Sequence, residues 1–314
     1  MARPAASTAP APAAGARWDL IALLIVGAAW GSAYPVIRAG LVAGAPPLLF
    51  AAVRYGLSAL ALVPIAYVAR SPRPDARSFL VAVACGGLLI IGLYGALLYL
   101  GEQTTSGGLS AVIAASATFW SVLFGLALLP QERLGRGELA GLLIGFAGVA
   151  VLMVPQLGTE SGIDGPLLVV SAILVFALGG VLLRRAAPAS PSLWTLSAQF
   201  AVASGLVGGC SLIFGEPWTL GRLSITGPAL VYLVAIPSLL GYVLYFGLHH
   251  RVGPARANVV AYVAPAAGVL VGFLVFGESV YLAELGGLVL IVVGLLIVHR
   301  ARTRGARAPV SANR

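Results

Sequence analysis

One charged residue stands well inside an apolar segment of this chain, and that residue is Arg54. It lies about eight residues into the segment 46–69, roughly 12 Å from its start at about 1.5 Å per helical residue. An unpaired arginine at that depth in a bilayer costs at least about 2.5 kcal/mol. Arg54 is therefore predicted to face a central cavity and attract a carboxylate on a substrate. The alternative is a structural role, in which the side chain snorkels to the outer interface or binds a carbonyl group at a helix end.

Aromatic and polar residues in other apolar segments could complete such a cavity. In the run 30–35, Pro35 lacks a backbone N–H and frees the carbonyl of Gly31, which in lipid must find a protein partner or cavity water. A packing kink with an interfacial tyrosine is the alternative. The predicted substrate-binding residues are Trp30, Ser32, Tyr34, Arg54, Tyr94, Trp120, Gln199, Tyr242, Asn258 and Tyr262.

Mid-segment prolines indicate places where helices could bend. Pro35, Pro237 and Pro265 are the predicted hinges or kinks, because each removes one helical hydrogen bond. Tyr99 and Tyr245 lie near segment ends, where an aromatic belt at the membrane interface explains them.

Acidic residues gather at the ends of the apolar segments. Glu132 and Glu278 follow two of them and Glu138 and Glu284 begin the next two, so they are predicted to stabilise the unpaired amides of helix N-termini. Proton carriage is the alternative role, and Glu102 at another segment end is a further candidate for it. No carboxylate lies clearly in mid-segment, so the sequence does not establish proton coupling.

The chain carries little that could serve an enzyme. His249 and His250 adjoin each other without the i, i+4 spacing of a metalloprotease motif, and no G-x-S-x-G occurs. Cys85 and Cys210 stand alone in apolar surroundings, which favours packed thiols over a disulfide or a zinc site. No metal or cofactor is expected, and an intramembrane enzyme is a remote alternative.

The composition indicates the kind of fold that positions these residues. Of 314 residues, 60% are hydrophobic and only 9% charged, against about 25% charged in soluble domains, and the mean hydropathy is +1.00. A membrane-spanning helix needs about 20 apolar residues. We therefore predict an all-α integral membrane protein with ten spans, near 18–40, 46–69, 79–100, 106–129, 137–155, 166–186, 192–215, 227–250, 255–276 and 280–298.

The arginines predict the orientation of these spans. With the N-terminus inside, the inner segments hold 16 of the 19 arginines, and the outer loops hold Arg222 and several acids. Such a bias predicts that both termini are cytoplasmic, with a disordered tail at 1–16 and a basic tail at 301–314. It also explains the net charge of +9 without a nucleic-acid partner, and the lipid bilayer is the expected surrounding.

The two halves of the chain resemble each other. An offset of 146 residues places Arg38 on Arg184, Tyr99 on Tyr245 and Glu132 on Glu278. Five spans per repeat is an odd number, so the unit 158–300 must be inverted relative to the unit 17–157. Inverted repeats with a site between them are typical of secondary transporters.

The residues also resemble a known family. The strings WGSAYPVIRAGL (30–41), FAAVRYGLSALAL (50–62) and ANVVAYVAPAAGVLVGFLVFGE (257–278) are similar to the EamA family of the drug/metabolite transporter superfamily. The resemblance implies a ten-helix, two-repeat secondary transporter of a bacterial inner membrane that exports amino acids or related small metabolites by alternating access. An uncoupled facilitator or channel and a multidrug exporter are the alternatives.

Glycines recur along one face of the fifth and tenth spans. The glycines concerned are Gly141, Gly145, Gly148, Gly286, Gly287 and Gly294. Small residues let helices approach closely, so these spans are predicted to pack through them, either with each other or across a homodimer contact.

Overall fold

The structure is a computed structural model, which describes residues 13–129, 135–154, 162–186, 192–245 and 260–307. All regular secondary structure in these ranges is helical. In the first half the helices are α1 (Ala13–Val42), α2 (Pro47–Val68), α3 (Ala76–Ala82), η1 (Val83–Leu93), α4 (Tyr94–Gly101), α5 (Gly107–Ala114), α6 (Ala117–Leu128) and α7 (Arg136–Met153). In the second half they are α8 (Asp164–Ala186), α9 (Leu193–Ile213), α10 (Leu223–Leu233), η3 (Val234–Gly241), α13 (Val260–Phe276) and α14 (Leu282–Arg307).

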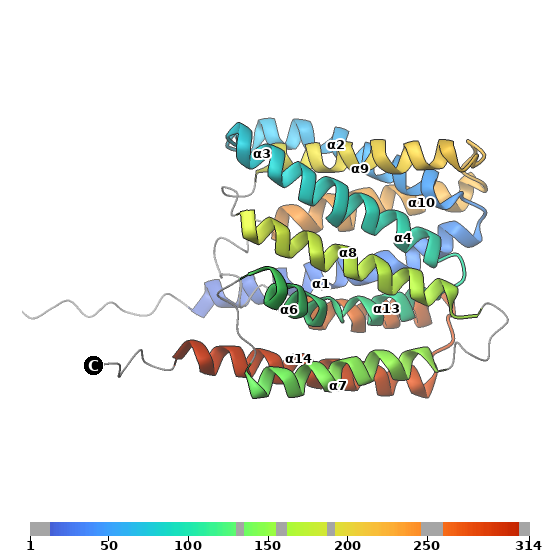
Figure 1. Cartoon of the computed structure of the whole chain (residues 1–314). Helices are drawn as coiled ribbons and strands as arrows, with labels where there is room; N and C mark the ends of the chain where they lie inside the picture. Colours follow the sequence, from blue (N-terminus) through green and yellow to red (C-terminus); the bar gives the residue numbers. More distant parts are fainter. Residues whose placement is uncertain (1–12, 130–134, 155–161, 187–191, 246–259, 308–314) are drawn as a thin grey trace, which may run out of the picture.

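Each of the ten predicted spans contains helix. Within the described residues, eight helices are long and apolar enough to cross a membrane, and α7 and α13 occupy the predicted fifth and ninth spans. The prediction of an all-helical protein is confirmed for the described residues, while the crossing of the membrane by all ten spans stays a prediction. The start of α1 and the end of α14 lie at the same end of the bundle, on the left in Figure 1; we call it the terminal end.

The helices are arranged so that corresponding parts of the two halves meet. Helix α2 packs along α9 and α7 along α14, and α1 packs on α13 as α8 packs on α5 and α6 (Figure 1). Between α7 and α14, a Cβ at Gly141 would lie 2.7 Å from the Gly294 carbonyl oxygen, and one at Gly148 2.8 Å from that of Gly287. The predicted packing of these two spans through glycines is confirmed at these four positions, whereas a Cβ at Gly286 would meet nothing within 4 Å. The homodimer stays a prediction.

Carboxylates stabilise several helix starts, as predicted, although one acts on an unexpected helix. Glu278 accepts hydrogen bonds from the backbone N–H groups of Gly107 (2.9 Å) and Gly108 (2.8 Å), so it caps α5 rather than the helix that follows it. Glu138 and Glu284 accept from backbone N–H groups three residues earlier. Glu132 lies outside the described residues. These bonds satisfy amides that a helix leaves unpaired at its N-terminus.

The third and eighth spans each contain a π-helical segment, η1 and η3. Pro237 lies inside η3, whereas α1 continues through Pro35. Pro35 instead forms a close crossing with α5, because a Cβ at Gly107 would lie 2.3 Å from the Pro35 Cα. A π-helical turn widens the backbone and is common at functional sites. The predicted kink at Pro237 marked the position of η3, whereas nothing in the residue pattern had indicated η1.

Candidate functional site

A cavity of about 790 Å³ lies inside the bundle, within the range of roughly 300–1,000 Å³ of small-molecule sites. Residues from both halves line it: α1, α2, α3, η1, α4, α5 and α6 contribute from the first, and α8, α9, η3 and α13 from the second. The lining is mostly apolar and aromatic with a few polar groups, as expected of a small-molecule site.

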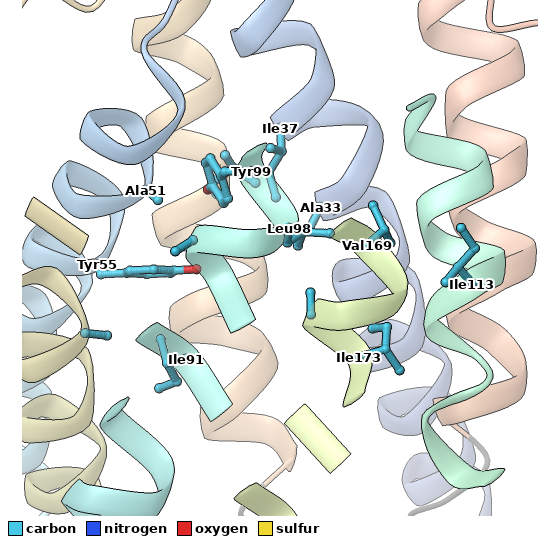
Figure 2. Packing of buried hydrophobic residues seen from close by; sticks show 14 of the residues in the cluster. Ala33, Ile37, Ala51, Tyr55, Ile91, Leu98, Tyr99, Ile113, Val169 and Ile173 are labelled. Atoms are coloured by element: carbon cyan, nitrogen blue, oxygen red, sulfur yellow. The ribbon is translucent and has the colours of Figure 1, made fainter. Parts of the chain in front are cut away.

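The cavity extends toward the terminal end. Pro74, Ser78, Arg184 and Ser192 line it there, beside the start of α3, the end of α8 and the start of α9. The opposite end is tightly packed: Tyr99 has 0% of its surface exposed and lies with Leu98 among α1, α2 and α8 (Figure 2). Among the described residues, the bundle is therefore closely packed at one end and hollow toward the other.

Arg54 is the charged centre of the cavity. It lines the cavity, yet only 8% of the residue is exposed. Its Nη1 donates to the Tyr99 hydroxyl (3.2 Å) and its Nε to the Ser238 hydroxyl (3.3 Å). The guanidinium thus does not snorkel to an interface, and its partners join α2, α4 and η3.

The contacts of Arg54 leave its charge uncompensated. In the described part of the chain no carboxylate lies within ion-pair distance of it, and two of its five N–H donors are in use. Neutral hydroxyl groups hold the guanidinium in place without neutralising it. A buried cation of this kind is stabilised by an anion that enters the cavity, and a planar guanidinium binds a carboxylate with two parallel hydrogen bonds.

Aromatic rings from both halves line the cavity that Arg54 enters. The Trp30 ring lies 5.3 Å from that of Tyr242 and 5.0 Å from that of Tyr245, and its Nε1 donates to the Pro237 carbonyl. On the other wall Tyr94 lies 5.4 Å from Phe176. Such rings offer apolar surface to a side chain and π-faces to an ammonium group.

Three further polar side chains line the cavity. The hydroxyl groups of Tyr34 and Tyr94, from α1 and α4, are 3.2 Å apart. Gln199 of α9 donates to the Ala82 carbonyl (2.8 Å), and both Gln199 and Ala82 line the cavity. Hydroxyl and amide oxygens can accept hydrogen bonds, so the cavity combines a cation with acceptors for a donor group.

The structure brings together most of the predicted site residues. Those that line the cavity are Trp30, Tyr34, Arg54, Tyr94, Gln199 and Tyr242, together with Pro237 and Pro265. Asn258 lies outside the described residues, and for Tyr262 only the backbone, in α13, is described.

Two predicted site residues point elsewhere. Ser32 is buried between α1 and α10, where its hydroxyl bonds to the Ala29 carbonyl and to the Tyr232 hydroxyl (2.7 Å). Trp120 is not among the cavity-lining residues and stacks edge-on against Phe146 of α7, with ring centroids 4.6 Å apart. Both predictions came from position along a span, which does not determine the face of the helix on which a side chain lies.

The structure adds residues that the sequence reasoning had passed over. Tyr99 was predicted to belong to an interfacial belt, yet it is buried and holds Arg54. Tyr245 lines the cavity, and Ser238 holds Arg54 from η3. The offset of 146 residues, which pairs Tyr99 with Tyr245, was the one signal that could have marked these two tyrosines.

The comparisons with known proteins agree on one family. A model of the EamA-like transporter family matches this chain twice, at residues 17–154 and 164–300. The chain is 30% identical over 296 residues to the uncharacterized inner membrane transporter YedA of Escherichia coli K12, covering 93% of each chain. It is 29% identical over 288 residues to a probable amino-acid metabolite efflux pump of Salmonella typhimurium, covering 88% of this chain and 93% of the pump.

A solved structure shows the same fold. It matches this chain with a TM-score of 0.63 and 21% identity, over 93% of this chain and 99% of its own. At that identity the match extends to the arrangement of helices and no further.

Proposed function

The chain belongs to the EamA-like transporter family, and on that premise we propose that it exports amino acids or related carboxylate-bearing metabolites across the inner membrane. Membership of this family points to transport rather than catalysis. The observation that carries the choice of substrate is the uncompensated guanidinium of Arg54 in the cavity.

The chemistry of the cavity suits a zwitterion with an apolar side chain. The remaining N–H donors of Arg54 would hold the carboxylate. Tyrosine hydroxyl groups and ring faces would receive the ammonium group, and the apolar lining would bury the side chain. A cationic drug would meet Arg54 as a like charge, which disfavours the multidrug alternative.

Transport would proceed by alternating access between two inverted halves. The arginine bias supports cytoplasmic termini, so the terminal end would face the cytoplasm and the cavity would be open inward. The two family matches, one in each half, support the internal repeat, and the meeting of α2 with α9 and of α7 with α14 supports a symmetry axis between the halves.

A counterflow assay on the purified protein in liposomes tests this function. Radiolabelled L-phenylalanine is offered outside liposomes loaded with unlabelled L-phenylalanine, and the same is done with phenethylamine, which lacks the carboxylate. An aliphatic pair, L-leucine and its amine, is run in parallel. We expect exchange of an amino acid and at least about tenfold slower exchange of its amine, since a charge-assisted hydrogen bond contributes about 1.5–3 kcal/mol. Faster exchange of the amines would contradict the carboxylate role and favour a cation exporter.

An imposed gradient separates a coupled transporter from an uncoupled facilitator. A coupled transporter accumulates the amino acid above equilibrium when a proton gradient is applied, and an uncoupler abolishes the accumulation. A facilitator only equilibrates the substrate, with or without the uncoupler.

Cysteine labelling tests the topology. In a background without Cys85 and Cys210, single cysteines at positions 158 and 219 should react with an impermeant reagent added outside intact cells. Cysteines at positions 74 and 188 should react only when the cytoplasmic side is exposed. The reverse pattern would overturn the orientation of the spans.

A further inference from the structure

Glu102 is a buried acid that the site described above does not use. It directly follows α4 at the closed end of the bundle, and 0% of its surface is exposed. Neither carboxyl oxygen has a hydrogen-bond partner among the described residues. The hydroxyl groups of Thr105 and Ser110 are also buried there without a regular hydrogen bond.

The nearest cation does not pair with this carboxyl group. Arg38 of α1 donates from Nη1 to the backbone carbonyl of Glu102 (2.9 Å) and to that of Gln103. It thus holds the C-terminal end of α4, where carbonyl groups lack helical partners. The Arg38 contact joins α1 to α4 and forms part of the closure of this end.

Other charged and titratable groups face Glu102 from the surrounding elements. They are Tyr34 and Arg38 of α1, Arg54 and Tyr55 of α2, Tyr99 of α4, and Glu278, the cap of α5. Ser110 and the two arginines favour the charged carboxylate, and Glu278 disfavours it.

Burial outweighs these contacts. A carboxylate removed from water without regular hydrogen bonds is strongly disfavoured relative to the neutral acid, and the nearby Ser110 hydroxyl group offsets this only in part. Burial accordingly raises the pKa of the Glu102 carboxyl group well above its usual range. The closed end of the bundle therefore favours the neutral acid at Glu102 over the carboxylate.

We propose that Glu102 is a proton-binding site whose occupation is required to close the outer end of the transporter. The proposal rests on the proposed alternating access, in which this end opens to the outside. When it opens, water reaches the carboxyl group, which releases its proton to the outer solution. The carboxylate is then available to Arg38, so that closing again requires a proton from outside.

The direction of the pH dependence follows from this linkage. The closed state favours the neutral acid, so its stability relative to the open state falls as the outer pH rises above the ordinary pKa of a glutamic acid. One linked proton changes the ratio of open to closed by at most tenfold per pH unit. An alkaline exterior should favour the outward-open state and an acidic exterior the closed state.

This proton site lies close to the cavity. Tyr99 precedes Glu102 by three residues on the same side of α4, and its hydroxyl group accepts from Arg54. Closing the outer end therefore positions Glu102 and also Tyr99. The Tyr99 hydroxyl group in turn orients Arg54, which is proposed to bind the carboxylate of the substrate.

The test measures how accessible the outer end is as a function of pH. Thr105 is 1% exposed and its hydroxyl group has no hydrogen-bond partner among the described residues, so Thr105→Cys in a background without Cys85 and Cys210 is a mild reporter. An impermeant maleimide is added outside cells at several pH values. At each pH, the labelling rate of the folded protein is divided by the labelling rate of the denatured protein. This ratio corrects for the pH-dependent ionisation of the cysteine thiol.

In the wild type we expect the corrected labelling rate to rise with outer pH, by up to tenfold per pH unit. In Glu102→Gln we expect the rate to stay low and independent of pH. Glu102→Leu gives the same readout should the glutamine variant fold poorly. Asp164→Asn is the matched control, because it removes an exposed carboxylate at the start of α8, at the same end, and should retain the wild-type pH dependence. A rate that does not depend on pH in the wild type, or the same rise in Glu102→Gln, overturns the proposal.

The two proposals can fail separately. Counterflow of L-phenylalanine at one constant pH tests transport without reference to Glu102. Labelling tests the proton site without any substrate. Loss of the pH response with intact counterflow rejects only the proton site, and intact pH response without amino-acid exchange rejects only the proposed substrate.

Discussion

Replacing Arg54 by alanine should reduce exchange of amino acids at least about tenfold, while most of the protein remains folded. The variant loses the charge-assisted hydrogen bonds that the guanidinium would make with a carboxylate, each worth about 1.5–3 kcal/mol. Folding should tolerate the change because a buried, uncompensated cation contributes little net stability, and because Arg54 lines the cavity, water can take its place beside the hydroxyl groups of Tyr99 and Ser238. Counterflow in liposomes, with the folded fraction measured by size-exclusion chromatography, gives both quantities.

Two further variants make this result specific. Arg54→Lys keeps the charge but loses the planar fork, so an intermediate rate is expected. Arg136→Ala makes the same change at an exposed arginine that begins α7 and should leave exchange unchanged. Equal losses of folded protein and of exchange in Arg54→Ala would assign Arg54 to structure alone.

Gly31→Ala, which adds a single methyl group, should lower the free energy of unfolding by about 1–3 kcal/mol, the usual cost of overpacking. A Cβ at this position would lie 2.0 Å from the Ala264 carbonyl oxygen and 2.9 Å from its carbonyl carbon. The obstacle is backbone, so no change of rotamer relieves it, and α1 must move away from α13 beside the cavity. Gly31→Ala should lower the midpoint of thermal unfolding in detergent by several degrees and also slow exchange.

Gly205→Ala supplies the matched control. Gly205 lies in α9 and a Cβ there would meet nothing within 4 Å. Alanine favours a helix over glycine by about 1 kcal/mol, so this variant should be as stable as the wild type or slightly more so. If Gly31→Ala matches it in thermal stability, the close crossing of α1 and α13 is wrong.

The family and the helical architecture could be predicted from residue types and spacing. Twenty-residue apolar stretches are sufficient to predict spans because a bilayer leaves a backbone few alternatives to a helix. The repeat was detectable because equivalent residues such as Arg38 and Arg184 recur at one offset. Arg54 stood out for the same kind of reason, since a charge within an apolar span is rare and costly.

The composition of the site could be predicted only in part. Trp30 and Tyr94 were placed correctly in the cavity, but Ser32 and Trp120 were not. When a membrane-spanning helix carries apolar residues on all of its faces, the hydrophobic pattern gives little indication of which face points toward the interior of the protein. The two π-helical segments rotate the residues that follow them, which makes the face still harder to infer.

The sequence by itself determined a helical membrane protein of two related halves with one unusual internal charge, because these properties depend on composition, length and periodicity along the chain. Only the tertiary structure decided that Tyr99 and Ser238 hold that charge, that Glu278 caps α5, and that the Glu102 carboxyl group is buried without a regular hydrogen bond to the described residues. Those relations join residues 45 to 184 positions apart, or depend on burial. They arise from the way in which helices cross, which local residue preferences do not specify.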